Sequence, residues 1–246
     1  MSKLHFFGFY APKKRLRILP VSLIMCLLLG SVAVGVQAAA KLHPIYRIQT
    51  ETKVAALTFD ISWGDHTPRP VLDILKKNHI HATFFLSGPW AKDFPEIPAQ
   101  IRDEGHEIAS HGNRHIDYSN LSRDEIRQEI STASASIQAV TGITPGLIRM
   151  PNGDYNNQVI QAAQECHCQP VQWSVDSLDW MNPGIDNIVA RVHEKIHPGA
   201  IILMHASDTC KQTTEALPLV LEDLKKQGYT FVTVSELLTM GNAQYQ

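Results

Sequence analysis

The chain has 246 residues, of which 44% are hydrophobic and 19% are charged, enough apolar material to bury one substantial core. It has no fixed-period repeat, low-complexity run or collagen-like composition, which excludes disordered, fibrous and solenoid classes. Residues 1–40 hold five Lys and Arg and no Asp or Glu, so the rest carries 17 basic against 24 acidic residues. This acidic balance argues against phosphate-backbone binding, which requires a basic face, so no nucleic-acid partner is expected. A neutral or carbohydrate substrate fits better.

The first forty residues have the pattern of a targeting segment. A basic stretch ending at Arg17 precedes an apolar run over residues 18–36 and a small-residue tail over residues 37–40. Sites ending at Ala38 and Ala40 suit signal peptidase. The alternative is a retained anchor, since the 19 residues of the apolar run would span about 28 Å as a helix. Both interpretations predict an extracytoplasmic body, with membrane contact through residues 18–36 if the segment is not cleaved.

After a short lead-in over residues 41–53, in which Ile45–Ile48 could add an edge strand, apolar segments alternate with helical patterns. Seven strands are predicted, at residues 54–60, 82–87, 107–111, 147–151, 171–176, 200–205 and 230–234. Five helices are predicted, at residues 70–78, 122–140, 158–165, 185–196 and 215–227. The second helix opens with a capping box, from Ser122 to Glu125.

This alternation predicts right-handed crossover units and a parallel sheet. About seven units favour a distorted or incomplete (β/α) barrel over residues 54–246, and an open doubly wound sheet is the alternative. Reactive side chains follow the predicted strands at their C-terminal ends, the rim where barrel active sites are built. These residues are Asp60, His111, Arg149, Asp176 and His205.

Two histidines on this rim have metal-ligand spacing. His111 and His115 lie at i and i+4, from which two imidazoles can hold one metal ion. With 12 His in the chain such a pair can arise by chance, but this one follows a strand and lies in a polar segment. Asp60 ends the first predicted strand and suits a metal ligand or the base that deprotonates a metal-bound water.

The remaining rim residues suggest acid catalysis and sugar binding. Arg149 can pair with a rim carboxylate, and the turn that follows it can present N–H groups to an oxyanion. An Asp hydrogen-bonded to His205 would raise the pKa of this imidazole and favour a general acid. Trp63 and Trp180 lie in rim loops, where they could stack on sugar faces or pack in the core.

Five motifs in one order give the chain a resemblance to the polysaccharide deacetylases of carbohydrate esterase family 4. They are Thr58–Gly64 (TFDISWG), Ser110–His115, Arg149–Gly153, Asp176–Trp180 and Leu203–His205, and the resemblance covers residues 54–238. It implies a distorted (β/α) barrel that removes N-acetyl groups from an N-acetylated glycan with a divalent metal, zinc being the expected ion. TFDISWG resembles the variant in deacetylases of spore-forming bacteria, which implies a role in sporulation and favours peptidoglycan as substrate, with a chitin-like glycan as the alternative.

The resemblance also implies the hydrolytic roles. A metal on His111 and His115 would polarise the acetamide carbonyl and the attacking water. Asp60 would take the proton of that water, and Arg149 would orient Asp60.

Further roles follow from the same resemblance. His205, tuned by Asp176, would protonate the departing amine. The Asn152 backbone N–H would help to hold the oxyanion, and Leu203 and Trp180 would line the pocket for the acetyl methyl group.

The chain departs from the family pattern at one position, because the second Asp of the first motif, usually the third metal ligand, is Ile61. Asp65 is the nearest replacement in the same loop; otherwise Asp60 binds the metal and is not a free base. Weak metal binding is therefore expected. A catalytically silent, deacetylase-like glycan-binding protein of the cell wall is the alternative function, although the four intact motifs favour the enzyme.

Overall fold

The computed structural model describes residues 1, 3, 5, 8 and 40–245, and its contacts divide the chain after Ala40 into two units. The signal peptide or anchor predicted at residues 1–40, with its apolar run at residues 18–36, lies almost entirely outside the described residues. Within the described part of the chain, no helix has the length and apolar character needed to cross a membrane.

The described strands form one ten-stranded, mostly parallel sheet in the order β10-β1-β8-β2-β3-β4-β5-β6, with β7 paired to β8 and β9 to β2. Among the described strands, β1 alone makes antiparallel pairs, with β8 and β10. The strands are β1 (Ile45–Gln49), β2 (Val54–Ile61), β3 (Thr83–Leu86), β4 (Glu107–Ser110), β5 (Leu147–Ile148), β6 (Gln169–Pro170), β7 (Val175–Asp176), β8 (Ala200–His205), β9 (Thr230–Val232) and β10 (Asn242–Tyr245).

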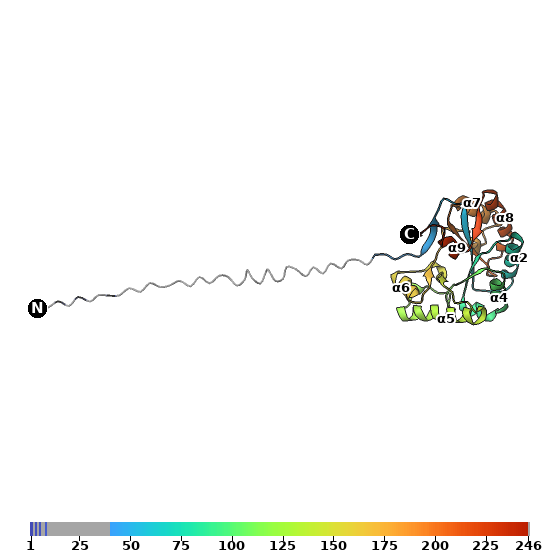
Figure 1. Cartoon of the computed structure of the whole chain (residues 1–246). Coiled ribbons are helices and arrows are strands. Elements are labelled where there is room, and N and C mark those ends of the chain that lie inside the picture. The colour runs from blue at the N-terminus through green and yellow to red at the C-terminus, as the bar shows by residue number, and fades with distance from the viewer. Residues whose placement is uncertain (2, 4, 6–7, 9–39, 246) are drawn as a thin grey trace. The chain divides into compact units, whose positions relative to one another are not determined.

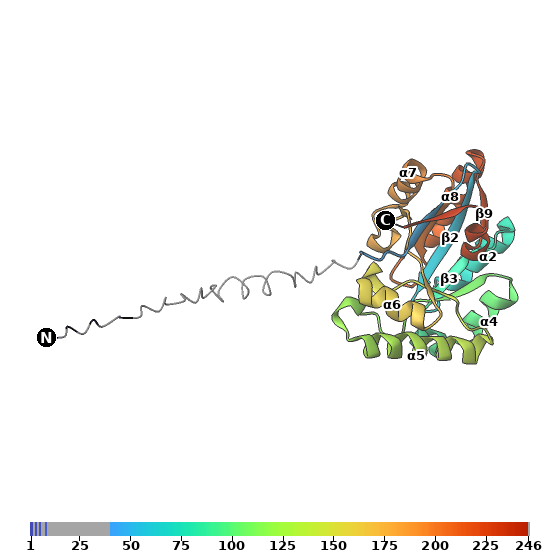
Figure 2. The ribbon, with the colours of Figure 1, turned by 60° about the vertical axis from the view of Figure 1, so that its left-hand side comes forward.

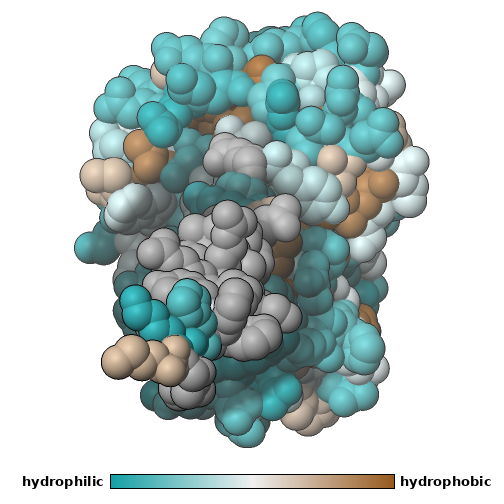
Figure 3. Space-filling view, turned by 90° about the vertical axis from the view of Figure 1, so that its left-hand side faces the viewer, coloured by the Kyte–Doolittle hydropathy of each residue, from teal (hydrophilic) through white to brown (hydrophobic). Residues whose placement is uncertain are grey.

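Helices surround this sheet, with α5 extended along one side of the molecule and α7 beside α8 (Figures 1 and 2). They are α2 (Pro68–Asn78), α3 (Gly88–Asp93), α4 (Glu96–Asp103), α5 (Arg123–Thr141), α6 (Asn157–Glu165), α7 (Ile185–Lys195), α8 (Thr213–Lys226) and α9 (Val234–Leu238), with short 3-10 turns η1 (Tyr118–Asn120), η2 (Pro151–Gly153) and η3 (Asp179–Met181). The described surface on the face drawn in Figure 3 is mostly hydrophilic, with scattered apolar residues.

The sheet curls until its two sides meet. Ile45 of β1 forms a parallel bridge with Val171, which directly follows β6, and the Gln172 N–H donates to the Ile45 carbonyl at 2.7 Å. Because β1 also pairs with β8, this bridge joins the β6 side of the sheet to the β8 side. The fold is therefore the distorted barrel that the sequence predicts and not an open doubly wound sheet.

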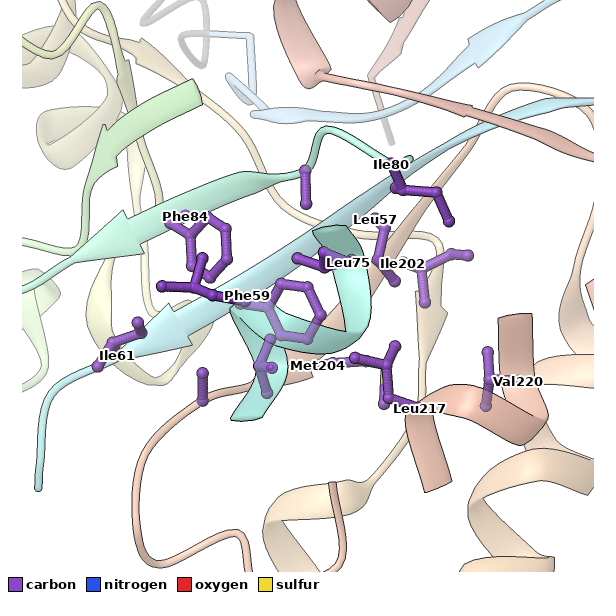
Figure 4. Close-up of a cluster of buried hydrophobic side chains, with 14 of the residues drawn as sticks. Leu57, Phe59, Ile61, Leu75, Ile80, Phe84, Ile202, Met204, Leu217 and Val220 are labelled. Carbon is purple, nitrogen blue, oxygen red and sulfur yellow. The ribbon is translucent and has the colours of Figure 1, made fainter. Parts of the chain in front are cut away.

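Alternate residues of β2 face two different environments, as in any strand. Leu57, Phe59 and Ile61 lie in an apolar layer with residues of α2 and α8 (Figure 4). Ala56 instead packs with buried residues of β3, β4, β5 and β8, a set that can meet only inside the barrel. Asp60 has the same parity as Ala56, so Asp60 faces the interior and Ile61 faces the helices.

All seven predicted strands and all five predicted helices occur, but several elements are shorter or differently placed. The strands predicted at residues 147–151 and 171–176 shrink to two residues each, in β5 and β7. The lead-in strand is not at an edge, because β10 pairs along its outer side. The short elements α3, α4, α9, β6 and β10 have no counterpart in the sequence prediction.

The capping box of α5 provides a test of local stability. Ser122 Oγ accepts the Glu125 N–H at 3.4 Å, and the Glu125 carboxylate accepts the Ser122 N–H at 2.8 Å. We expect Ser122→Ala to lower the free energy of unfolding by about 1 kcal/mol, measured by urea denaturation. Ser131→Ala, at an exposed position of the same helix, is the matched control and should change it little. Equal losses in the two variants would contradict the capping role.

Candidate active site

The C-terminal ends of the parallel strands surround a pocket of about 380 Å³. Nine of the residues predicted from the sequence line it: Asp60, Trp63, His111, His115, Asn152, Asp176, Trp180, Leu203 and His205. Arg149 is fully buried and contacts Asp60, whereas Asp65 does not line the pocket. The lining residues that sequence reasoning did not single out are Gly153, which ends the third motif, and Trp173, Ser207, Thr209 and Cys210, which lie outside the five motifs.

A buried ion pair holds the reactive carboxylate. Arg149 Nη1 donates to Asp60 Oδ1 at 2.7 Å and to Thr58 Oγ1 at 2.9 Å, and Nη2 donates to the Gln172 carbonyl at 3.0 Å. The guanidinium also stacks on the Phe85 ring, 4.1 Å from its centroid. Burial by itself would raise the pKa of Asp60, but the charge of Arg149 and of nearby histidines lowers this pKa below its usual value. Asp60 is therefore ionised at neutral pH.

The two histidines are oriented by the segment that follows β4. Gly112 turns this segment with φ of 74°, and any Cβ there would lie 2.2 Å from the Tyr118 hydroxyl. His111 Nδ1 lies 2.9 Å from the Arg149 carbonyl, so Nδ1 is the donor and Nε2 lies 3.8 Å from Asp60 Oδ2. The His115 ring centroid is 5.3 Å from that of His111.

These imidazoles are in the form that binds metals. Burial lowers the pKa of His111 to about 4, and burial also lowers the pKa of His115, so both rings are neutral at pH 7. Neutral imidazole nitrogens, such as those of His111 and His115, are donors of the type that binds a divalent ion such as zinc. Ile61, which replaces the expected third ligand, is fully buried in the apolar layer (Figure 4).

Asp65 lies elsewhere in the loop after β2. Its carboxylate, 40% exposed, clusters with His66 and Asp208 rather than with the pocket histidines. The Asp208 carboxylate accepts the N–H groups of Asp65, His66 and Thr67 at 3.2, 3.0 and 2.8 Å, which ties this loop to the end of β8. In this arrangement Asp65 is not placed to complete a metal site with His111 and His115.

The carboxylate that hydrogen-bonds to His205 is not the one that the sequence predicts. His205 Nδ1 lies 2.8 Å from Asp179 Oδ1, and Asp179 Oδ2 accepts the His205 N–H at 2.8 Å and the Thr213 hydroxyl at 2.7 Å. Asp176 instead accepts the Leu178 N–H at 2.8 Å. The hydrogen-bond partner of His205 is therefore Asp179 and not the expected Asp176, whose carboxylate interacts with His205 through its charge. Leu178 has φ of 57°, and this left-handed turn between the two carboxylates decides which of them reaches His205.

The His205 pair favours the charged imidazole. Burial by itself would lower the pKa of His205, but the hydrogen bond and the charge of Asp179 raise this pKa above its usual value. Because Nδ1 is held by Asp179, Nε2 is the nitrogen left to give a proton to a bound molecule.

The remaining pocket residues form its turn and its walls. Asn152 has φ of 58°, its side chain donates to Asp117 at 2.7 Å, and its backbone N–H has no acceptor among the described residues. Leu203 is buried on β8. Trp63 and Trp180 are each 50% exposed, so they lie at the mouth of the pocket and not in the core.

Comparison with known proteins identifies the family. The family model described as Polysaccharide deacetylase matches residues 47–171. A peptidoglycan-N-acetylglucosamine deacetylase of Bacillus cereus is 38% identical over 197 residues, covering 78% of this chain and 92% of that protein. The uncharacterized protein YlxY of Bacillus subtilis is 34% identical over 80% of this chain, which spans 60% of that relative's length. The chain belongs to the polysaccharide deacetylase family.

Solved structures include a relative that lacks activity. A CE4 family pseudoenzyme from Bacillus anthracis is 36% identical, with a TM-score of 0.76 over 82% of this chain and 71% of that one. A mutant of the same protein, described as having restored enzymatic activity, matches with a TM-score of 0.76 and 37% identity. Activity in this family therefore depends on the residues of each pocket and does not follow from membership alone.

The pairing of His205 can be tested by titration. We expect Asp179→Asn to lower the pKa of His205, because the substitution removes the charge that stabilises the imidazolium. The pKa is measured by NMR from the shift of the imidazole C–H resonance. Asp176→Asn is the matched control and should have the smaller effect. A larger decrease of the His205 pKa in Asp176→Asn than in Asp179→Asn would instead support Asp176 as the partner of His205.

Proposed function

We propose that this chain is a metal-dependent hydrolase that removes N-acetyl groups from an N-acetylated glycan, with peptidoglycan as its substrate. The observation that carries the proposal is that one pocket holds an ionised Asp60 and a His205 whose pKa is raised. Amide hydrolysis needs one group that accepts a proton from water and another that protonates the departing amine. Two titratable groups whose environments favour opposite charges fit these two roles.

The residues then act as follows. Asp60, held by Arg149, orients the attacking water and accepts its proton through Oδ2. His205 donates a proton from Nε2 to the amine, and Asp179 stabilises the imidazolium before that transfer. The Asn152 N–H donates to the developing oxyanion.

A metal and the pocket walls complete this assignment. A divalent ion such as zinc, held by His111 and His115, would supply Lewis-acid polarisation of the acetamide carbonyl. Leu203 offers an apolar surface to the acetyl methyl group, and Trp63 and Trp180 offer ring faces to the sugars.

A second candidate function is a catalytically silent glycan-binding protein of the cell wall. The observation that favours it is Ile61, an aliphatic residue buried away from the pocket where a ligand is expected. The pseudoenzyme relative supports the same alternative. We favour the enzyme because a binding protein has no need of a buried Arg–Asp pair and a raised His pKa in one pocket.

Acetate release tests the enzyme directly. The zinc-loaded protein is expected to release acetate from peptidoglycan, and a chelator should abolish the release. His205→Ala should lower turnover by about 10²-fold or more, because it removes the proton donor. His193→Ala is the matched control, since His193 also pairs with a carboxylate, that of Asp223, but does not line the pocket, and it should leave turnover unchanged.

Zinc titration of the same proteins separates the two candidates. Binding should be lost in His111→Ala and kept in Asp65→Asn, because only His111 lies in the pocket. The silent candidate predicts a different result. The protein would bind glycan but release no acetate from peptidoglycan or chitin oligomers, and it would take up no more zinc than His111→Ala.

We also propose that the protein acts outside the cytoplasm, in the cell wall of a spore-forming bacterium. The basic stretch, apolar run and small-residue tail within residues 1–40 support export. If the segment is cleaved, N-terminal sequencing of the exported protein should find Ala39 or Lys41 first. An intact chain that needs detergent for release would instead establish an anchor at residues 18–36.

A further inference from the structure

A second and larger cavity, of about 680 Å³, opens beside the catalytic pocket. The two cavities share four lining residues, Asn152, Gly153, Trp173 and Asp176. They are therefore neighbours with a common wall. A polymeric substrate whose acetamide group enters the first cavity would place an adjoining sugar in the second.

Basic side chains from two elements line this second cavity, which we call the basic groove. They are Arg47 of β1 and Arg191 and Lys195 of α7, the last two one helical turn apart. Among the described residues, Asp176 is the only acidic one that lines it. This local excess of positive charge contrasts with the acidic balance of residues 41–246, 17 basic against 24 acidic.

The charges of the groove are available to a ligand. Arg47 and Lys195 are exposed, and neither has an ion-pair partner in the described part of the chain. Arg191 Nε donates to the Asp176 carbonyl at 2.7 Å, which fixes the side chain and leaves its terminal nitrogens for a second acceptor.

A buried polar group in the groove also lacks a partner. The Gln172 side chain is 2% exposed, and its Nε2 donates to the Gly153 carbonyl at 3.0 Å. Its Oε1 is buried without a hydrogen bond among the described residues. Buried polar atoms are rarely left unpaired, so this wall of the groove holds an acceptor that is unmatched by the described residues.

We propose that the basic groove is a subsite for a carboxylate carried by the sugar next to the one that is deacetylated. The proposal rests on the proposed function and names the substrate class of the same site. Peptidoglycan strands that have lost their stem peptides carry such a group, the free lactyl ether carboxylate of N-acetylmuramic acid, whereas chitin carries none. Guanidinium and ammonium groups bind carboxylates by charge-assisted hydrogen bonds, so the groove would select the carboxylated glycan over a neutral one.

The test compares the affinities of three tetrasaccharides, so that it does not depend on turnover. The ligands are the peptide-free alternating tetramer of N-acetylglucosamine and N-acetylmuramic acid, its methyl ester, and the chitin tetramer. They are titrated calorimetrically into the full-length His205→Ala protein. The free acid is expected to bind about 10-fold or more tightly than the ester, with a preference that shrinks as salt is added.

Variants assign this preference to the groove. Lys195→Gln and Arg47→Gln, each made in the His205→Ala protein, should weaken binding of the free acid several-fold and leave the ester and chitin unchanged. Lys77→Gln is the matched control, because Lys77 is also an exposed lysine in the last turn of a helix but lies outside both cavities. Equal affinities for acid and ester, or groove variants that bind the acid as well as the parent protein, would overturn the proposal.

Acetate release by the unmutated protein separates this proposal from the function on which it rests. A preference for the free acid without any acetate release would contradict the enzyme and support the groove. Acetate release without a preference for the free acid would support the enzyme and overturn the groove.

Discussion

The buried ion pair between Arg149 and Asp60 is the interaction on which this end of the barrel depends. A fully buried guanidinium costs several kcal/mol unless its charge and its donors are matched. Here the Asp60 carboxylate, the Thr58 hydroxyl and the Gln172 carbonyl accept three of its five N–H groups and the Phe85 ring stacks on its face, while Nε has no partner among the described residues. The partners come from β2, β3 and the segment after β6, so the pair connects opposite sides of the sheet where the pocket forms.

The chemistry of the pocket follows from this pair and from strand alternation. Arg149 keeps Asp60 ionised, while Asp179 favours the charged form of His205 in the same cavity. The alternation that turns Asp60 inward turns Ile61 outward into the apolar layer (Figure 4), so the site has two neutral histidines and one close carboxylate. The basic groove adds positive charge on the other side of Trp173 and Asp176, where a neighbouring sugar would lie.

Much of this arrangement could be predicted from the sequence, because hydrophobic periodicity is local and the C-terminal ends of parallel strands meet at one rim. That rule alone brings Asp60, His111 and His205 together. The features that the sequence did not predict depend on tertiary geometry. Two-residue strands such as β6 exist only through their pairing partners, and β1 closes the barrel through one bridge. Spacing could not reveal that a left-handed Leu178 brings Asp179 to His205, or that Asp208 holds the loop of Asp65 away from the histidines.

The most direct measurement of the central ion pair is a double-mutant cycle on the free energy of unfolding, with Arg149→Met, Asp60→Asn and both substitutions together. Each single variant leaves one buried polar partner unmatched, so the free energy of unfolding measured by urea denaturation should fall by about 3–5 kcal/mol in each. The double variant should lose less than the sum of the two, by about 1 kcal/mol or more. Additive losses would contradict the account, because they would mean that the two groups do not depend on each other.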